Sequence, residues 1–357
     1  MVLSFRPLSS RVGTRLAKRE LQSCAREFVE LSPGTRRYRP PAIALPGEID
    51  RITLFNDWTP ARDYVRYETL EHLSEGEDVH AATTAFRVED VLVADGCIYA
   101  PWAVSVVTKE KRRPLLSGPV DEIDEAQLVT THCGSIFFGD WLMVDVPIEL
   151  LSLQRGLRPL SIANRVYGHE PEYRERFGLG PPTRPSSIVR AASLWIVNDN
   201  GMTEGRVKRY QTLRNRVRST ESDGPARVFI DRDGNWGVPR GLANRDEVIR
   251  ALAGRGFEMI HPERMSVDEL SKALCCAQIC VGVEGSALTH ATMMVAPGAC
   301  IVAIQEADRF TSGIKWFADA VDMRYGFLVA ERQSSDAQIH VDVKRLHATL
   351  DLAERAL

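Results

Sequence analysis

The chain has 357 residues, of which 44% are hydrophobic and 26% charged, as expected for a globular protein of about two domains. Its formal net charge of −3 provides no overall positive field that would attract nucleic acid or lipid. Seven cysteines are spread along the sequence, and Cys275, Cys276 and Cys280 have no plausible histidine partner nearby for a metal site. We therefore expect structural thiols in a reducing, cytoplasmic compartment.

The N-terminus is basic. No apolar run approaches the roughly 20 residues that span a bilayer, and no signal peptide is visible. Five cations precede the first acid, Glu20: Arg6, Arg11, Arg15, Lys18 and Arg19. One interpretation is a solvated helix that caps the first domain, which the thin apolar face favours. The other is a helix that lies on anionic lipid, as a peripheral contact with the inner face of the membrane.

The first half of the chain predicts short strands followed by a helix. Apolar and polar residues alternate over 86–107 on both sides of Asp95-Gly96, and an Asp-Gly pair in that position predicts a β-hairpin. Residues 141–153 have helical spacing, with Pro147 early enough to be a kink or a restart.

The second half predicts strands that alternate with helices. Apolar runs that predict buried strands lie at 227–231, 257–260, from 279 and at 299–304. Helices are expected at 244–253 and 266–277, where Asn244 with Glu247 and Ser266 with Glu269 have the capping-box spacing. This alternation indicates a Rossmann-like parallel sheet.

The basic helix at 206–218 precedes this sheet. It contains six basic residues and no acid, with apolar residues at helical spacing. Two interpretations of its cationic face remain: a face in contact with solvent only, or a binding site for an acidic acceptor or a diphosphate.

A glycine turn follows the strand that begins at Ile279. The sequence Val283-Glu284-Gly285-Ser286 leads into a helix, and Pro297-Gly298 ends that helix. Ligands of parallel sheets bind at the carboxyl ends of the strands, and a helix that starts there offers N–H groups to an anion. An ordinary strand-helix-strand unit without a ligand is the alternative.

Six motifs of the second half follow one another in a recognisable order. They are Phe229-Ile230-Asp231-Arg232, Val238-Pro239-Arg240, Asn244-Arg245-Asp246-Glu247-Val248, Gly256-Phe257, Glu284-Gly285-Ser286-Ala287-Leu288 and Pro297-Gly298. In this order they resemble the C-terminal half of the glycosyltransferase family 61 proteins, also described as DUF563. A weaker match upstream is Gly134 to Leu142, so the resemblance covers about Cys133 to Ile304.

The resemblance implies an α/β, GT-B-like fold, in which two Rossmann-like domains face an interdomain cleft. We expect an acceptor-side domain at 1–200, a nucleotide-sugar-binding domain at 201–335, and a C-terminal helix at 336–357 that packs back on the first domain. The resemblance also implies a nucleotide-sugar donor, a glycan or polysaccharide acceptor, inversion at the anomeric carbon, and no obligatory metal or other cofactor.

The resemblance assigns candidate residues and shows departures. The donor-binding candidates are Arg232, Arg240, Gly282, Glu284, Gly285 and Ser286. The family's two histidines are replaced by Asp140 and Glu284, and the acid of its Pro-Gly-Ser block by Ala303. Asp140 is the candidate catalytic base, and a helix N-cap beside Trp141 is the alternative.

Two rival functions remain. Asp231 and Asp233 mimic the D-x-D motif of metal-dependent transferases, where two carboxylates hold Mg²⁺ or Mn²⁺ against a diphosphate. The three departures favour a different rival, a non-catalytic partner that binds a sugar nucleotide or glycan in a polysaccharide assembly system.

Overall fold

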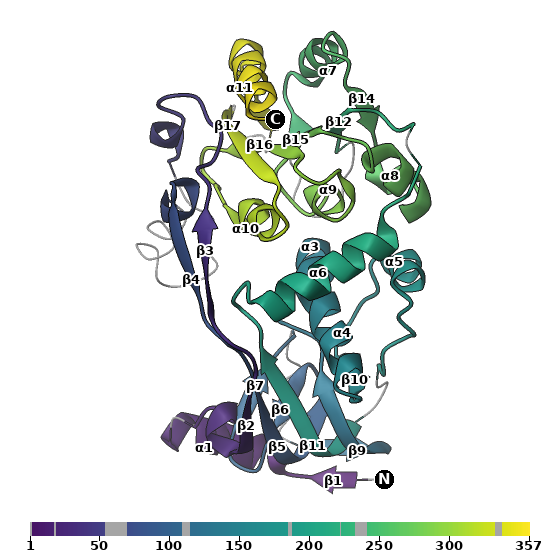
Figure 1. The fold of residues 1–357 in the computed structure, drawn as a ribbon. Coiled ribbons are helices and arrows are strands. Elements are labelled where there is room, and N and C mark those ends of the chain that lie inside the picture. Colours follow the sequence, from purple (N-terminus) through teal and green to yellow (C-terminus); the bar gives the residue numbers. More distant parts are fainter. Residues whose placement is uncertain are drawn as a thin grey trace. The chain divides into compact units, whose positions relative to one another are not determined.

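The computed structural model describes residues 2–17, 19–53, 70–108, 115–184, 188–221, 223–232, 241–332 and 338–357 (Figure 1). The chain forms two compact units, the first made of Met1–Thr35 and Val79–Tyr210, the second of Arg36–Asp78 and Gln211–Leu357. The boundary therefore falls inside helix α6 (Glu204–Val217) and not near Asn200, and residues 36–78 belong to the second unit.

A seven-stranded mixed sheet organises the first unit. Its order is β10 (Arg158–Leu160), β9 (Val120–Leu128), β11 (Ile188–Asn198), β5 (Thr83–Ala94), β6 (Cys97–Tyr99) and β7 (Val104–Val106), with β2 (Ala25–Ser32) also paired to β5. Strand β9 is parallel to β10 and β11, and the other pairs are antiparallel. The expectation of a Rossmann-like sheet here is therefore wrong, because such a sheet is mostly parallel and β5 is antiparallel to β2, β6 and β11.

The hairpin predicted at Asp95-Gly96 is confirmed. Ala94 of β5 pairs with Cys97 of β6, so two residues form the turn. Both have positive φ, 52° at Asp95 and 79° at Gly96, as a type I′ turn requires.

Smaller elements complete the first unit. They are β1 (Val2–Ser4) paired with β8 (Leu116–Gly118), α1 (Arg6–Ala17), the 3-10 turn η1 (Leu21–Cys24), α3 (Phe138–Asp140), the π-helical segment η3 (Trp141–Asp145), α4 (Val146–Gln154) and α5 (Glu170–Phe177). A separate pair, β3 (Thr35–Arg39) and β4 (Gly76–His80), lies where the chain passes between the units.

The second unit has the predicted parallel sheet. Its order is β13 (Gly241–Leu242), β18 (Gln338–His340), β17 (Arg324–Arg332), β16 (Cys300–Glu306), β15 (Ile279–Val283), β12 (Arg227–Ile230) and β14 (Glu258–Ile260). The five strands from β17 to β14 are parallel to one another, and β18 is antiparallel to β17. Numbered along the chain they follow the order 2-1-3-4-5, a doubly wound arrangement whose order reverses between β12 and β15.

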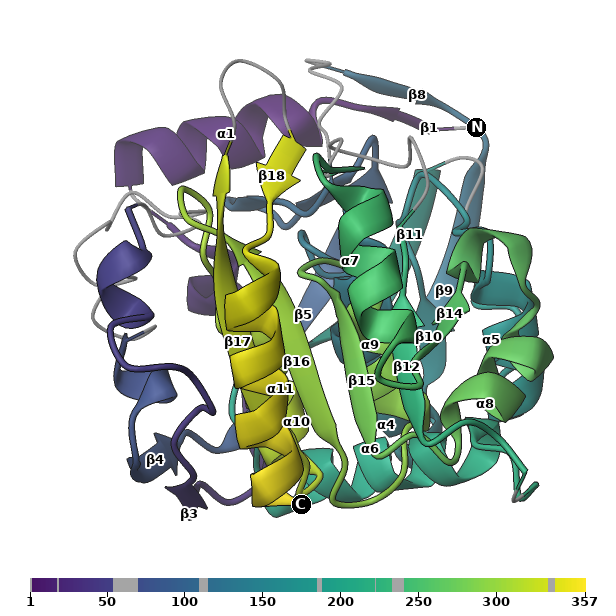
Figure 2. The same ribbon diagram turned by 90° about the horizontal axis from the view of Figure 1, so that it is seen from above.

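Helices cover both faces of this sheet (Figures 1 and 2). The helical elements are η2 (Ile49–Arg51), α7 (Arg245–Ala253), η4 (Pro262–Arg264), α8 (Val267–Leu274), α9 (Leu288–Met294), α10 (Gly313–Ala320) and α11 (Val343–Ala356). Helices α7 and α11 lie together on one face, while α9 and α10 lie on the other. The buried strands therefore read as continuous apolar runs, as the sequence indicated.

The C-terminal helix corrects one expectation. Leu346, Leu350 and Ala353 of α11 are buried in one core with Val281 and Val302 of the parallel sheet. The apolar side of α11, which was expected to pack on the first domain, is therefore used within the second unit.

The two predicted capping boxes differ in outcome. At α8 both bonds of the box between Ser266 and Glu269 are present, which confirms the prediction. At α7 the Asn244 side chain makes no cap bond. Its amide instead donates to the Val341 carbonyl at 2.8 Å, and its oxygen accepts from the Val341 N–H at 3.0 Å, because the end of β18 lies beside it.

Glu48 anchors residues 36–53 to the second unit. Its side chain is fully buried and accepts hydrogen bonds from the backbone N–H of Val329 in β17 and from the guanidinium of Arg345 in α11. Ile43 adds a parallel bridge to Gly326 of the same strand. These contacts explain why this segment leaves the first domain expected from the sequence.

We expect Glu48→Ala to lower the free energy of unfolding by about 2–4 kcal/mol, because it leaves Arg345 and a buried N–H without their acceptor. Glu48→Gln, which keeps an acceptor for Val329, should cost less. Urea unfolding measures both. Equal stability of Glu48→Ala and the wild type would show that the segment is not held in this way.

Candidate functional site

The glycine turn lies at the carboxyl end of β15. The N–H of Glu284 still donates to the carbonyl of Ile304 in β16, at 2.9 Å. The chain then turns at Gly285, whose φ of 140° favours glycine. Glu284, Gly285 and Ser286 are half-buried and directly precede α9. The structure thus brings three of the predicted donor-binding residues together at the reversal of strand order.

Gly282 has a packing reason of its own. It lies inside β15, and a Cβ there would approach Leu288 of α9 to 2.7 Å and the Ile230 carbonyl oxygen to 3.3 Å. Close packing of α9 on the sheet therefore explains this glycine without a ligand, and its role in donor binding stays a prediction.

Asp231 follows β12 directly and is buried. Its Oδ2 accepts from Arg245 Nε at 3.0 Å and from a second nitrogen of the same guanidinium. His261 Nδ1, at the end of β14, lies 3.6 Å from this oxygen. The first carboxylate of the D-x-D pattern is thus engaged by an arginine, which a metal ion would have to displace.

Arg232 is the next residue and is half-buried at the carboxyl end of β12. Arg240 and Asp233 lie outside the described residues. Arg245, which the sequence reasoning did not single out, starts α7 and keeps 36% of its side chain exposed while it holds Asp231. In the sequence, Arg245 could have been noticed because it directly follows Asn244, the predicted cap of this helix.

The end of β16 presents carboxylates of its own. Ala303 is fully buried inside the strand. Glu306 ends the strand and pairs with Arg332 at 2.9 Å, and Asp308 pairs with the same arginine at 3.1 Å.

Arginines of α6 are used inside the protein. Arg214 is buried and donates to the carbonyls of Thr292 and Val295, which end α9, the second at 2.9 Å. Burial lowers the pKa of Arg214 to about 9. Arg218, directly after α6, donates to the Met294 carbonyl at 3.0 Å. These arginines therefore stabilise a helix end, and the solvated cationic face considered for this helix is wrong for them.

A helix with an irregular turn dominates the second region of interest, in the first unit. Elements α3, η3 and α4 run continuously from Phe138 to Gln154. Pro147 has no N–H, so the carbonyl four residues before it, that of Met143, loses its usual helical donor. The Tyr210 hydroxyl and the Arg206 guanidinium donate to that carbonyl instead. Such π-turns are frequent at functional sites.

Asp140 is the third residue of α3, with helical angles of φ −70° and ψ −36°. The N-cap is Phe137, so the interpretation of Asp140 as the N-cap is wrong. Its half-buried carboxylate lies in the first turn, where negative charge is favoured. Partial burial raises the pKa of Cys133 most, and the negative charges of Asp140 and Asp145 raise it further.

Asp145 ends the π-turn and is buried. Its Oδ1 accepts from the N–H and hydroxyl of Thr131 at 3.0 and 2.7 Å. A Cβ at Gly134 would lie 2.2 Å from Oδ2, so only glycine lets the loop approach this closely. Burial raises the pKa of Asp145 well above its ordinary value, with smaller contributions from the charges of Asp140 and Glu149.

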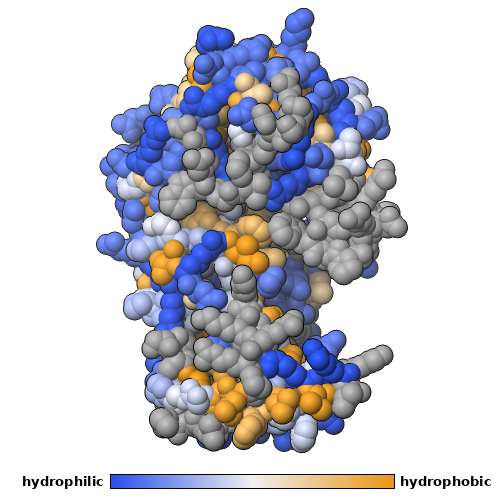
Figure 3. Space-filling view, turned by 180° about the vertical axis from the view of Figure 1, so that it is seen from behind, coloured by the Kyte–Doolittle hydropathy of each residue, from blue (hydrophilic) through white to orange (hydrophobic). Residues whose placement is uncertain are grey.

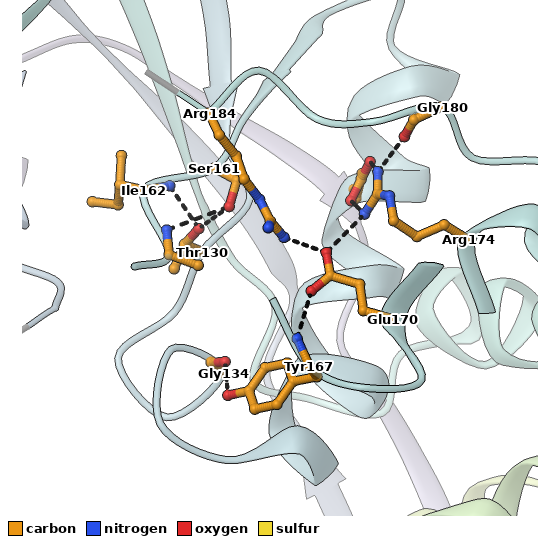
Figure 4. A network of polar contacts seen from close by, with 11 residues as sticks. Thr130, Gly134, Ser161, Ile162, Tyr167, Glu170, Arg174, Gly180 and Arg184 are labelled. Atoms are coloured by element: carbon orange, nitrogen blue, oxygen red, sulfur yellow. Dashed lines mark hydrogen bonds and ion pairs between the residues drawn. The ribbon is translucent and has the colours of Figure 1, made fainter. Parts of the chain in front are cut away.

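Tyr167 closes the other side of this loop. Its hydroxyl donates to the Gly134 carbonyl at 2.7 Å, and burial raises its pKa to about 12 (Figure 4). Its backbone N–H donates to Glu170 at 3.3 Å, and Glu170 also pairs with Arg184. The loop at 131–137 is thus held from both sides, by Asp145 and by Tyr167.

Residues 53–302 match the glycosyltransferase 61 family, which is more than half of the chain and includes both regions. The chain belongs to glycosyltransferase family 61. The resemblance expected from the sequence is therefore confirmed, and the protein is a member of a transferase family that uses a sugar donor and an acceptor. No curated protein matches the chain.

In this glycosyltransferase, sequence reasoning missed three residues that define the loop region: Thr131, Asp145 and Tyr167. A signal did exist for Asp145, since an acid two residues before a mid-helix proline is unusual in an apolar stretch. Among the described residues, no helix is long and apolar enough to cross a bilayer. Over the same ranges, no three His, Cys, Asp or Glu side chains are grouped to hold a metal ion.

The pH dependence of stability tests the environment of Asp145. Its ordinary pKa is 3.8 and its folded pKa is higher, so between the two values the folded protein binds more protons than the unfolded chain. The contribution of Asp145 to stability therefore falls as pH rises through this window. Asp145→Asn cannot ionise and still offers an oxygen to Thr131.

We expect the stability of Asp145→Asn relative to wild type to increase from about pH 4 upward, measured by urea unfolding at several pH values. Glu175→Gln, at an exposed position of α5, controls for the loss of one negative charge. A difference that is constant with pH, or that decreases, would contradict the buried environment of Asp145.

Proposed function

We propose that this family 61 protein transfers a sugar from a nucleotide-sugar donor to a glycan or polysaccharide acceptor, with inversion at the anomeric carbon and without a metal ion. The observation that supports it most is the glycine turn and the arginines at the reversal of strand order. Doubly wound sheets bind ligands at that place. We further propose a GT-B-like protein in which the nucleotide-binding unit alone is Rossmann-like.

The donor diphosphate would be bound by arginines and backbone N–H groups. Arg232 at the end of β12, Arg240, and the turn at Gly285 and Ser286 supply them in this proposal. Negative charge grows on the leaving diphosphate during transfer, so fixed cations stabilise the transition state more than the ground state. Arg245 adds a further cation, held in place by buried Asp231.

Metal independence is supported by the state of Asp231. Its Oδ2 accepts two bonds from one guanidinium, an arrangement that satisfies a carboxylate without a cation from solution. Arginine binds diphosphate oxygens through two parallel bonds, so it can replace Mg²⁺ or Mn²⁺ in this role.

Inversion needs a base that takes the proton of the acceptor hydroxyl, and Asp140 is our candidate. Its carboxylate is half-buried beside a loop that Asp145 and Tyr167 hold in place. Glu284, half-buried at the glycine turn, is proposed to contact the sugar or the nucleoside.

A panel of nucleotide-sugars tests the function, with release of nucleoside diphosphate as the readout and with and without EDTA. We expect release from at least one donor, unchanged by EDTA. If EDTA abolishes the release of nucleoside diphosphate and Mn²⁺ restores it, a metal-dependent transferase that uses Asp231 and Asp233 is favoured. Donor binding without release, in the presence of glycan acceptors, would favour the non-catalytic binding partner.

Arginine variants test the diphosphate site. Arg232→Ala and Arg240→Ala should each weaken nucleoside diphosphate binding about ten-fold or more in calorimetry, because a charge-assisted hydrogen bond contributes about 1.5–3 kcal/mol. Arg250→Ala, at an exposed position of α7, should bind normally. Unchanged affinity in both variants would show that the diphosphate binds elsewhere, and unfolding of both would make these arginines structural.

Asp140→Asn tests the base. The variant keeps the shape of the side chain but cannot take a proton, so we expect kcat to fall about 10²-fold or more. Donor affinity and melting temperature should change little. Glu122→Gln, at an exposed position of β9, is the control. Near-normal turnover of Asp140→Asn would leave the base to another residue.

A further inference from the structure

Helix α1 packs on the first unit through its small residues. Pro7, Ser10 and Gly13 form its buried face. The Ser10 hydroxyl donates to the carbonyl of Ala100. A Cβ at Gly13 would lie only 2.2 Å from the carbonyl oxygen of Trp102. The helix therefore lies directly against the chain between β6 and β7, with no room there for a large side chain.

Three large apolar residues of this segment face outward. Phe5, Leu8 and Val12 expose 64%, 51% and 43% of their surfaces, at spacings of three and four residues that put them on one side of the helix. A helix of a globular protein normally turns such a stripe toward the core. Here the stripe is reversed, so the exposed apolar residues need another partner.

Basic residues follow the apolar stripe toward the C-terminal end of α1. Arg15 follows Val12 by three residues and is exposed, and Arg19, two residues beyond the end of α1, is exposed as well. No acid precedes Glu20 in the sequence. Arg6, at the start of the helix, pairs with Asp90 at 2.5 Å. The outward side of α1 therefore combines an apolar first half with a positive second half.

Trp102 lies beside this helix and exposes 54% of its surface. Tryptophan is enriched where apolar lipid meets water, because its ring is apolar and its N–H is polar. Seen from behind, hydrophobic residues gather next to hydrophilic ones at the foot of the molecule, where α1 lies (Figure 3). We call Phe5, Leu8, Val12, Arg15, Arg19 and Trp102 together the α1 surface.

We propose that the α1 surface binds an anionic lipid bilayer, with α1 parallel to the membrane plane. Phe5, Leu8, Val12 and the Trp102 ring enter the interface, and Arg15 and Arg19 lie at the level of the lipid phosphates. Amphipathic helices with arginines bind membranes in this way, and each cation near an anionic surface strengthens binding. The positive charge on this side selects an anionic bilayer over an uncharged apolar partner, and the proposal is independent of the catalytic one.

Co-sedimentation with vesicles tests the proposal. The full chain should sediment with vesicles of phosphatidylcholine and phosphatidylglycerol and much less with phosphatidylcholine alone. The double variant Leu8→Ser/Val12→Ser should bind these vesicles at least about ten-fold more weakly, because it removes two apolar side chains from the bilayer. Val166→Ser, which changes a 58% exposed valine elsewhere in the first unit, should sediment like the wild type.

A charge variant separates the two contributions. Vesicle binding by Arg15→Ala/Arg19→Ala should fall about five-fold per arginine at low salt and should change little at high salt. Melting temperatures check that both double variants fold. Failure of the wild type to bind anionic vesicles, or equal binding of all variants, overturns the proposal. So does a wild-type dimer in light scattering that Leu8→Ser/Val12→Ser converts to a monomer, since the α1 surface would then bind a second copy.

Discussion

The reversal of strand order between β12 and β15 determines where the second unit can bind a ligand. Strand β14 lies on one side of β12 and β15 on the other, so the chain leaves these strands toward opposite sides of the sheet. Helix α7, which follows β12, covers one face, and α9, which follows β15, covers the other (Figures 1 and 2). In doubly wound sheets a ligand binds at this reversal, outside the carboxyl ends of the strands. Arg232 and the turn at Gly285 therefore follow the carboxyl ends of neighbouring strands.

Most of the arginines described above have a structural task, and that limits what a basic stretch indicates. Arg206 and Arg214 donate to backbone carbonyls that helices leave without a donor, one at the π-turn and one at the end of α9. Arg174 makes a two-bond pair with buried Glu149. A guanidinium has five donors in a fixed plane, so a single arginine can satisfy several carbonyls at once. A binding role is better supported for Arg245, which stays partly exposed while buried Asp231 orients it.

The sequence predicted what depends on local pattern. The parallel strands, the type I′ hairpin at Asp95-Gly96 and the capping box at Ser266 each follow from residues close together in the chain. The mixed sheet of the first unit, the pairing of Asp231 with Arg245 and the return of Glu48 to the second unit depend on contacts between distant residues. The outward stripe of α1 shows a further limit, because an amphipathic pattern indicates which side is apolar but not which side faces the protein. The candidate site was predicted at the glycine turn by a local signal, whereas Asp145 was missed because its partners lie at the other end of a loop.

Asp140 and Asp145 lie five residues apart in one helical stretch, yet their surroundings differ. Asp145 is buried, and the nearby negative charges of Asp140 and Glu149 add to burial in raising its pKa. A raised pKa favours the uncharged form of Asp145, whereas the side chain of Asp140 is only half-buried. Both bonds from Thr131 go to Oδ1, and Oδ2 lies next to Gly134. A π-turn that places one carboxyl in the interior and leaves the other half-exposed therefore separates a structural acid from a candidate base.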